Sequence, residues 1–152
     1  MTRIPFLDLK SATDEIKLEL ENSISRVILS GMYIGGDVVS RFESSFSEFV
    51  DCKYAIGVGN GLDALKIALL ALDIGPGDQV IVPSHTFIAT WLAVSSIGAK
   101  PIPVSVDEMN YNLDPSQIRG AITDKTKAII VVHLYGRPAD LTAIESIARE
   151  YG

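Results

Sequence analysis

The stretch that decides the fold is GVGNGLDAL, at residues 57–65. It follows a short apolar segment, Tyr54–Ile56, and leads into a run of apolar and small residues from Ala64 to Leu72. Glycines at a strand-to-helix turn let backbone N–H groups approach an anion, and a helix start adds unpaired donors and a positive dipole end. The stretch therefore predicts a phosphate-binding turn, although a tight turn whose glycines only permit positive φ explains the same residues.

The same glycines do not match the dinucleotide-binding fingerprint. That pattern places a third glycine three residues after the second and an acidic residue about 20 positions further on. Here Leu62 stands at the place of the third glycine, and the next expected strand, 79–82, ends in Pro83, Ser84 and His85. A ligand with a single phosphate therefore fits better than a nicotinamide dinucleotide.

The composition is that of one globular domain and argues against several classes of protein. Of the 152 residues, 47% are hydrophobic and 21% are charged, with a formal net charge of −6. An acidic chain without a basic run argues against nucleic-acid binding, and no apolar run reaches the roughly 18 residues of a membrane span. The single cysteine, Cys52, is most simply a packing residue. Because the first residues also lack a signal-peptide pattern, we expect a cytoplasmic protein.

Apolar periodicity predicts the elements in chain order. Residues 4–9 are expected to form an extended arm, and residues 13–29 an amphipathic helix. The turn Gly31–Gly36 then leads to a second helix, which is expected to be capped by Asp37 and to place its three phenylalanines in the core. From residue 53 onward strands and helices alternate. The strands are expected near 53–58, 79–82, 101–106 and 127–132, and the helices near 62–72, 87–97, 115–122 and 139–150. Asp114 and Pro115 mark the start of the helix at 115.

This alternation predicts an α/β domain with a largely parallel sheet. The strands are rich in Val and Ile without strict alternation, as expected where helices cover both faces of a sheet. Ligands of such sheets lie beyond the carboxyl ends of the strands. At those ends the sequence offers four loops: Gly59–Gly61, Ser84–Phe87, Asp107–Glu108 and His133–Gly136.

Both histidines of the chain, His85 and His133, fall in these loops. Taken alone, each is most simply a surface or structural residue. Together with the neighbouring acids they suggest a metal, but no close ligand spacing such as H-x-x-x-H supports one, and we expect no metal site. Ser84 beside His85 does not form the nucleophile elbow of a hydrolase triad.

Several segments resemble the DegT/StrS family of sugar aminotransferases, which bind pyridoxal phosphate on an aspartate-aminotransferase-like (fold type I) scaffold. The similar segments run through the whole chain in the family's order: PFLDL at 5–9, SGMYIGG at 30–36, NGLDAL at 60–65, GPGDQV at 75–80, PSHTFIAT at 83–90 and VHLYG at 132–136. The chain resembles most the branch that aminates 3-oxo-6-deoxyhexoses carried on thymidine diphosphate (dTDP).

The resemblance implies a fold and a division of the chain. The fold would be the N-terminal part of the large domain of a fold type I enzyme, a mostly parallel sheet flanked by helices. Residues 1–36 would form an N-terminal arm, a helix and a glycine turn. Residues 37–152 would form an incomplete pyridoxal-phosphate-binding domain.

The resemblance also implies site residues. The backbone amides of Gly61 and Leu62, with Asn60 beside them, would hold the cofactor phosphate. Phe87 would stack on the pyridine ring, and a core aromatic residue is the alternative for this position. The substrate would be contacted by further residues: Tyr33, His85 and His133.

No catalytic residue is expected within residues 1–152. The family places both the aspartate that pairs with the pyridinium nitrogen and the Schiff-base lysine beyond Gly152. The lysines present here do not replace it, because Lys100 and Lys127 start strands at the edge opposite the ligand. Asp107 ends a strand and is most simply a turn residue. We expect the chain to be the first part of a larger enzyme, and a relative that has lost its chemistry is the alternative.

The implied function is the transfer of an amino group, from L-glutamate, to a dTDP-linked 3-oxo-6-deoxyhexose in deoxyamino-sugar biosynthesis. The enzyme would be a homodimer. Two alternatives stay open: a pyridoxal-phosphate-dependent sugar dehydratase of the same fold, and a non-catalytic partner subunit that binds a phosphate ligand. The 152 residues alone are expected to be inactive and poorly soluble.

Overall fold

The computed structural model describes residues 4–152. Its contacts divide the chain into two compact units, an N-terminal unit of residues 1–57 and a C-terminal unit of residues 58–152. The glycine turn 31–36 belongs to the first unit, and the candidate segments from Gly59 onward belong to the second. The division expected between residues 36 and 37 concerns the domains of the family fold, and it stays a prediction.

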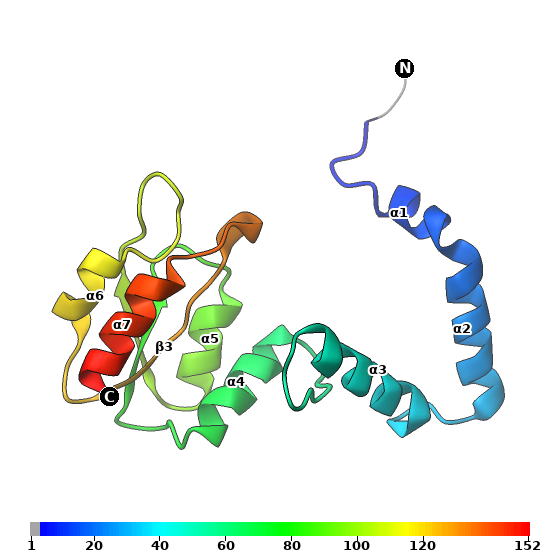
Figure 1. Ribbon diagram of the computed structural model, residues 1–152, viewed down its shortest axis with the longest axis horizontal. Coiled ribbons are helices and arrows are strands. Elements are labelled where there is room, and N and C mark those ends of the chain that lie inside the picture. The colour runs from blue at the N-terminus through cyan, green and yellow to red at the C-terminus, as the bar shows by residue number, and fades with distance from the viewer. Residues whose placement is uncertain (1–3) are drawn as a thin grey trace. The chain divides into compact units, whose positions relative to one another are not determined.

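Helices make up most of the described N-terminal unit (Figure 1): α1 (Leu9–Glu15), α2 (Lys17–Ser30) and α3 (Gly36–Phe49). The single helix expected over 13–29 is wrong in two respects. A helix already begins at Leu9, because the Asp8 side chain accepts a hydrogen bond from the N–H of Ser11 and caps it. The helix then breaks at Ile16, whose φ of −114° and ψ of 15° depart from helical geometry.

The start of α3 also differs from the expectation. Asp37 is not the N-cap, because Gly35 precedes the helix and Asp37 lies in its first turn. There its negative charge still interacts favourably with the helix dipole. Gly35 and Gly36 have φ of 65° and 79°, a left-handed conformation that explains why glycines occupy the turn.

The phenylalanines of α3 are exposed, so the expectation that they are core residues is wrong for this structure. Phe42 and Phe46 stack on one another with ring centroids 5.6 Å apart. Among the described residues 4–57 none is buried. A few helices without a second layer of secondary structure cannot enclose side chains of this size.

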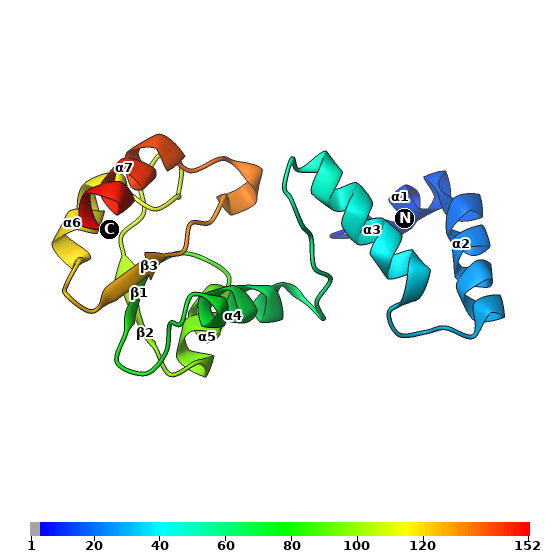
Figure 2. The same cartoon turned by 60° about the horizontal axis from the view of Figure 1, so that its bottom comes forward.

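The C-terminal unit contains a parallel sheet with helices on both faces (Figure 2). Its strand order is β2-β1-β3, with β1 (Gln79–Pro83), β2 (Lys100–Val104) and β3 (Thr126–Ile129). The helices are α4 (Gly61–Ala71), α5 (Ala89–Ser96), α6 (Pro115–Ala121) and α7 (Leu141–Tyr151), and a short 3₁₀ turn, η1, spans Leu134–Gly136. The predicted α/β class with a parallel sheet is confirmed.

The expected strand near 53–58 is wrong. Residues 54–58 have no regular secondary structure and pair with no strand of the described sheet. A strand exists only as part of a hydrogen-bonded ladder, so an apolar segment without a neighbour does not form one. The strands expected at 101–106 and 127–132 are present but shorter, because pairing with β1 stops at Val104 and Ile129.

The core is built on the alternation of side chains along β1. Val80 and Val82 pack on the face covered by α4 and α5, together with Leu69 and Val94. Ile81 points to the other face and packs with residues of α6 and α7. Successive residues of a strand face opposite sides, so a central strand with both faces covered needs an unbroken apolar run.

Side-chain caps set the starts of the later helices. The Asp114 side chain accepts a hydrogen bond from the N–H of Ser116, and Pro115 occupies the first turn, as predicted. Asp140 caps α7 in the same way through the N–H of Ala143. The bounds of these helices therefore agree with the sequence prediction within two residues.

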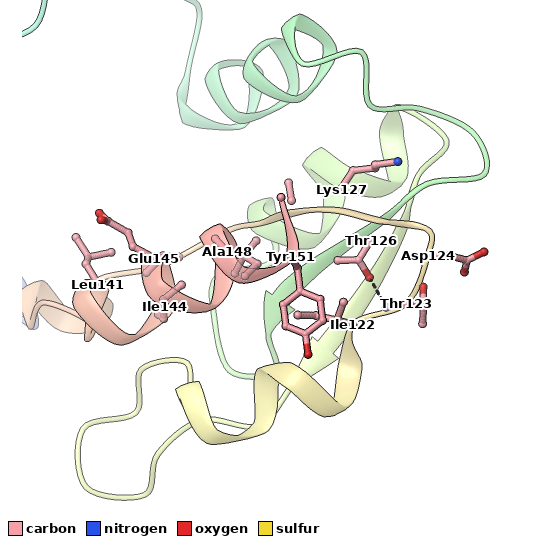
Figure 3. Close-up of a pocket in the computed structure, with 14 residues that line it drawn as sticks. Ile122, Thr123, Asp124, Thr126, Lys127, Leu141, Ile144, Glu145, Ala148 and Tyr151 are labelled. Atoms are coloured by element: carbon pink, nitrogen blue, oxygen red, sulfur yellow. Dashed lines mark hydrogen bonds between the residues drawn. The ribbon is translucent and has the colours of Figure 1, made fainter.

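A cavity of about 730 Å³ lies beside β3 and α7 (Figure 3). Ile129, Ile144 and Tyr151 are among its lining residues, and β3 is an edge strand of the described sheet. The lining begins at Ile122 and Thr123, before the amino end of β3, and includes none of the predicted site residues. Since ligands of parallel sheets bind at the carboxyl ends of the strands, we do not take this cavity as the candidate site.

Within residues 4–152, no helix combines the length and the apolar character needed to cross a membrane.

Candidate functional site

The start of α4 offers free backbone donors. Asn60 is the N-cap, and its side-chain oxygen accepts a hydrogen bond from the N–H of Asp63 at 2.9 Å. The first N–H groups of a helix have no partner within the helix. The amides of Gly61 and Leu62 precede the capped one, and no acceptor for them is found within residues 4–152. Two adjacent donors at the positive end of a helix dipole suit a phosphate group.

Gly61 leaves space in front of these donors. A Cβ added to Gly61 would meet no atom within 4 Å. Leu62 in contrast packs its side chain against the core cluster of α4, α5 and β1, so its backbone is anchored. α4 leads through residues 72–78 into the amino end of β1, which places the start of α4 toward the carboxyl edge of the sheet.

The loop after β1 presents His85 and Phe87. It is held at both ends, because Trp91 Nε1 donates to the carbonyl of Pro83 at 3.1 Å and the hydroxyls of Thr86 and Thr90 lie 2.9 Å apart. Phe87 itself is 76% exposed. An apolar ring that is exposed on an anchored loop contributes little to the core and is available to stack on a ligand.

The loop after β2 is a structured turn. The Asp107 carboxylate accepts hydrogen bonds from the N–H groups of Met109 and Asn110, at 2.9 and 3.0 Å. The interpretation of Asp107 as a turn residue is confirmed. A pairing of Val106 with Leu113 closes the loop at its base.

His133 takes part in the connection to α7. Its Nδ1 accepts a hydrogen bond from the N–H of Ala139 at 3.1 Å. The Nε2 of an imidazole whose Nδ1 accepts is the nitrogen that carries the proton in the neutral ring, so Nε2 is left as a donor. His133 therefore has a structural contact through one nitrogen and a donor for a ligand through the other.

Two tyrosines lie next to His85, and the sequence analysis assigned a role to neither, although it placed the loop of Tyr135 at this edge. The ring of His85 lies 6.3 Å from that of Tyr111 and 6.5 Å from that of Tyr135, measured between centroids. His85 Nε2 and the Tyr135 hydroxyl are 3.4 Å apart. The signal that could have found them is the strand order, because Tyr111 and Tyr135 follow the two strands that flank β1.

Tyr33 lies in the N-terminal unit, where its hydroxyl donates to the carbonyl of Ile28 at 3.3 Å. This hydrogen bond ties the glycine turn back to the last turn of α2. Asn60, Gly61, Leu62, Phe87, His85 and His133 all belong to the C-terminal unit.

An ion pair joins α6 and α7. Arg119 Nη2 donates to Glu150 Oε2 at 2.7 Å, and this hydrogen bond lowers the pKa of Glu150 and raises the pKa of Arg119. Both side chains are exposed on α6 and α7, so the pair is a surface contact. The part of the chain that the structure describes contains no group of His, Cys, Asp and Glu side chains placed to hold a metal ion.

A parallel α/β domain with free backbone donors at a helix start and an exposed aromatic residue at the carboxyl edge of its sheet is typical of an enzyme that binds a phosphorylated cofactor. Residues 14–152 match the DegT/DnrJ/EryC1/StrS aminotransferase family. The chain belongs to this family, which confirms the resemblance found in the sequence.

A curated relative is the dTDP-3-amino-3,4,6-trideoxy-alpha-D-glucose transaminase of Streptomyces venezuelae. It is 49% identical over 150 residues, which are 99% of this chain and 40% of the relative. The chain thus spans about 40% of the length of this relative.

Solved structures of the family have the same fold. DesV from S. venezuelae matches with a TM-score of 0.97 and 49% identity over 100% of this chain and 41% of its own. NtdA from Bacillus subtilis, solved with bound cofactor PMP, matches with a TM-score of 0.94 and 36% identity over 99% of this chain and 35% of its own. The described chain therefore has the fold of the N-terminal region of these aminotransferases.

Proposed function

We propose that the intact protein is a pyridoxal-phosphate-dependent aminotransferase that moves an amino group from L-glutamate to a dTDP-linked 3-oxo-6-deoxyhexose. The observation that supports this most is the 49% identity to a dTDP-amino-sugar transaminase over 99% of the chain. The segments that would meet the cofactor, the start of α4 and the loop after β1, lie within this matched region.

The residues present fit a pyridoxal phosphate group. Its phosphate would accept hydrogen bonds from the amides of Gly61 and Leu62, while Asn60 keeps the third amide of the helix capped. Phe87, exposed on its anchored loop, would lie against the face of the pyridine ring. The open space at Gly61 supports this arrangement, because a side chain there would occupy the approach to the two amides.

When bound, pyridoxal phosphate serves as an electron sink and carries the amino group between donor and acceptor. The chain's own residues bind and orient it. Gly61 and Leu62 would hold the phosphate through their backbone amides, and Phe87 would lie against the ring. His85 and His133 present imidazole nitrogens at the carboxyl edge, where they would contact the sugar, and Tyr33 is proposed as a further sugar contact.

The other parts of the proposal concern partners and location. We propose a homodimer that works in the cytoplasm on a nucleotide-linked keto sugar. The proton-transferring group is not proposed among residues 1–152, because Lys100 begins β2 and Lys127 lies in the first half of β3, away from the carboxyl edge.

The test uses the intact protein loaded with pyridoxal phosphate. Its absorbance at about 420 nm should fall on addition of L-glutamate and return on addition of dTDP-3-oxo-6-deoxyglucose. Mass spectrometry should identify the product as a dTDP-amino sugar. A product that has lost water and gained no nitrogen would identify a dehydratase instead. A protein that binds the cofactor and changes neither substrate would contradict the proposed activity.

A further inference from the structure

Three aromatic rings meet at the carboxyl edge of the sheet, one from the loop after each strand. Tyr111 follows β2, His85 follows β1 and Tyr135 follows β3. Because the strand order is β2-β1-β3, His85 lies between the two tyrosines. The ring of His85 is tilted against that of Tyr111, with centroids 6.3 Å apart and an interplanar angle of 56°, and against that of Tyr135, at 6.5 Å and 60°. We call these residues the Tyr111–His85–Tyr135 cluster.

The two tyrosines have an unusual backbone conformation. The φ of Tyr111 is 60° and that of Tyr135 is 55°, in the left-handed region that bulky residues seldom adopt. Such conformations persist only where the surrounding structure imposes them, and they gather at ligand sites. Both positions hold a tyrosine despite this strain, which points to a use for the ring.

One buried side chain holds both tyrosine loops together. Asn112, directly after Tyr111, is only 3% exposed. Its Nδ2 donates to the carbonyl of Arg137 at 3.0 Å, and its Oδ1 accepts from the N–H of Leu134 at 2.9 Å. Leu134 and Arg137 enclose Tyr135 in the chain, so Asn112 fixes the backbone on both sides of it.

The cluster is open to a ligand from outside. Tyr135 is 81% exposed and Tyr111 is 51% exposed. None of the three residues carries a guanidinium or ammonium group; they offer ring faces, two hydroxyls and an imidazole nitrogen. The guanidinium of Arg137, two residues after Tyr135, donates to the carbonyl of Met109 at 3.4 Å. A phosphate or carboxylate is recognised through such cationic groups. A ring with apolar faces and hydroxyl groups at its edge, such as a pyranose, suits the cluster better.

We propose that the Tyr111–His85–Tyr135 cluster is a subsite for the hexose ring of a nucleotide-linked sugar, and that Asn112 is the positioning residue that presents it. The inference rests on the proposed function and adds Tyr111, Tyr135 and Asn112 to the residues of the site. The nucleotide itself binds elsewhere. Stacking of the cluster on the thymine base is the competing arrangement, which the following experiment separates.

The experiment compares the affinities of the intact, cofactor-loaded protein for dTDP and for dTDP-glucose by titration calorimetry. Tyr135→Ala should weaken dTDP-glucose binding by about three- to tenfold, the worth of one aromatic contact, and leave dTDP binding unchanged. Tyr135→Phe keeps the aromatic ring and should retain most of the difference between the affinities for dTDP-glucose and for dTDP. Tyr151→Ala, which removes an exposed tyrosine at the end of α7, is the control and should change neither affinity.

Asn112 needs a separate control, because its removal also destabilises the fold. Asn112→Ala should lower the ratio of dTDP-glucose to dTDP affinity at a temperature where the variant is folded. Ile118→Val, a change in the buried core of α6, should lower the melting temperature and leave this ratio unchanged.

Each outcome is decisive. Equal losses for dTDP and dTDP-glucose, or a weaker affinity for pyridoxal phosphate, in Tyr135→Ala would overturn the subsite. The subsite would also be overturned if the ratio of dTDP-glucose to dTDP affinity were unchanged in both Tyr135→Ala and Asn112→Ala. In that case, amination of the keto sugar by the wild-type protein would show that the proposed function still stands. A wild-type protein that fails to aminate the keto sugar would overturn the proposed function and, with it, this inference.

Discussion

Asn60 and Asp63 hold each other through two hydrogen bonds at the start of α4. Asn60 Oδ1 accepts from the N–H of Asp63 at 2.9 Å, and Asn60 Nδ2 donates to Asp63 Oδ2 at 2.9 Å. Both polar ends of the Asn60 amide are thereby engaged. The proposed phosphate must then be bound by the preceding amides of Gly61 and Leu62, and Asn60 acts by fixing the helix start.

Gly61→Val should weaken the binding of pyridoxal phosphate by at least about tenfold, or roughly 1.4 kcal/mol. The added side chain would stand in the open space before the two amides, and since a Cβ there meets no atom within 4 Å, the fold should tolerate it. Cofactor titration of the intact protein measures the effect.

The matched control is Gly120→Val. A Cβ at Gly120 in α6 also meets nothing within 4 Å, and this helix lies outside the candidate site. Cofactor affinity should not change in this variant. If Gly61→Val kept its native cofactor affinity while remaining folded, the turn would have to be removed from the site.

Phe87→Ala should weaken cofactor binding and shift the cofactor's absorbance band, with little change in melting temperature. The reason is that Phe87 is 76% exposed, so its removal leaves almost no cavity. Phe87→Trp, which keeps an aromatic face, should retain most of the affinity. A variant with a lower melting temperature and native cofactor titration would indicate a purely structural phenylalanine.

His133→Asn and His133→Gln should behave differently. The side-chain oxygen of Asn can take the position of Nδ1 and accept a hydrogen bond from the N–H of Ala139. The side chain of Gln is longer, and its polar end lies nearer the position of Nε2. Thermal melting should therefore be closer to wild type for His133→Asn. The Michaelis constant for the keto sugar should rise in His133→Asn if Nε2 contacts the substrate, and a wild-type value would assign His133 a structural role alone.

The pair of Arg119 and Glu150 should make stability depend on pH in the acidic range. The hydrogen bond from Arg119 lowers the pKa of Glu150 in the folded state. A lowered carboxyl pKa stabilises the fold above the usual carboxyl pKa, and this contribution disappears as the pH falls through the folded-state pKa. Arg119 stays charged over this whole range.

Glu150→Gln should accordingly lower the melting temperature slightly near pH 7, and the difference from wild type should disappear as the pH falls below the lowered folded-state pKa of Glu150. Because the pair is exposed, the effect is expected to be small. The double variant Arg119→Gln/Glu150→Gln should melt close to Glu150→Gln. A difference between wild type and Glu150→Gln that persists in acid would have to come from something other than this ion pair.

The sequence predicted the C-terminal unit well because its local signals agree with one another. Asp114 and Pro115 start α6, and the apolar run of β1 reflects a strand covered on both faces. The strand near 53–58 could not be predicted correctly, since pairing depends on a neighbour that no local pattern reveals. The break at Ile16 was missed for a related reason, because both flanking segments favour helix and only backbone geometry marks the boundary.

The candidate site likewise contains residues that the sequence predicted and residues that it did not. The helix start at Asn60 and Gly61 has a local signature in glycines and a capping residue, and it was predicted. Tyr111, Tyr135 and Asn112 have none, because they are brought to His85 by the strand order and by hydrogen bonds between distant loops. Sequence reasoning that stops before topology cannot find such a group.

A polypeptide of residues 1–152 expressed alone should self-associate and show no transaminase activity. Ile24, Phe42 and Phe49 are exposed on α2 and α3, and β2 and β3 present open edges in the described sheet. Exposed apolar patches and unpaired strand edges both favour aggregation. Light scattering should detect the self-association, and Phe42→Lys combined with Phe49→Lys should reduce it. A monodisperse wild-type monomer with a cooperative melt would contradict the first half of this prediction, and measurable amino transfer would contradict the second.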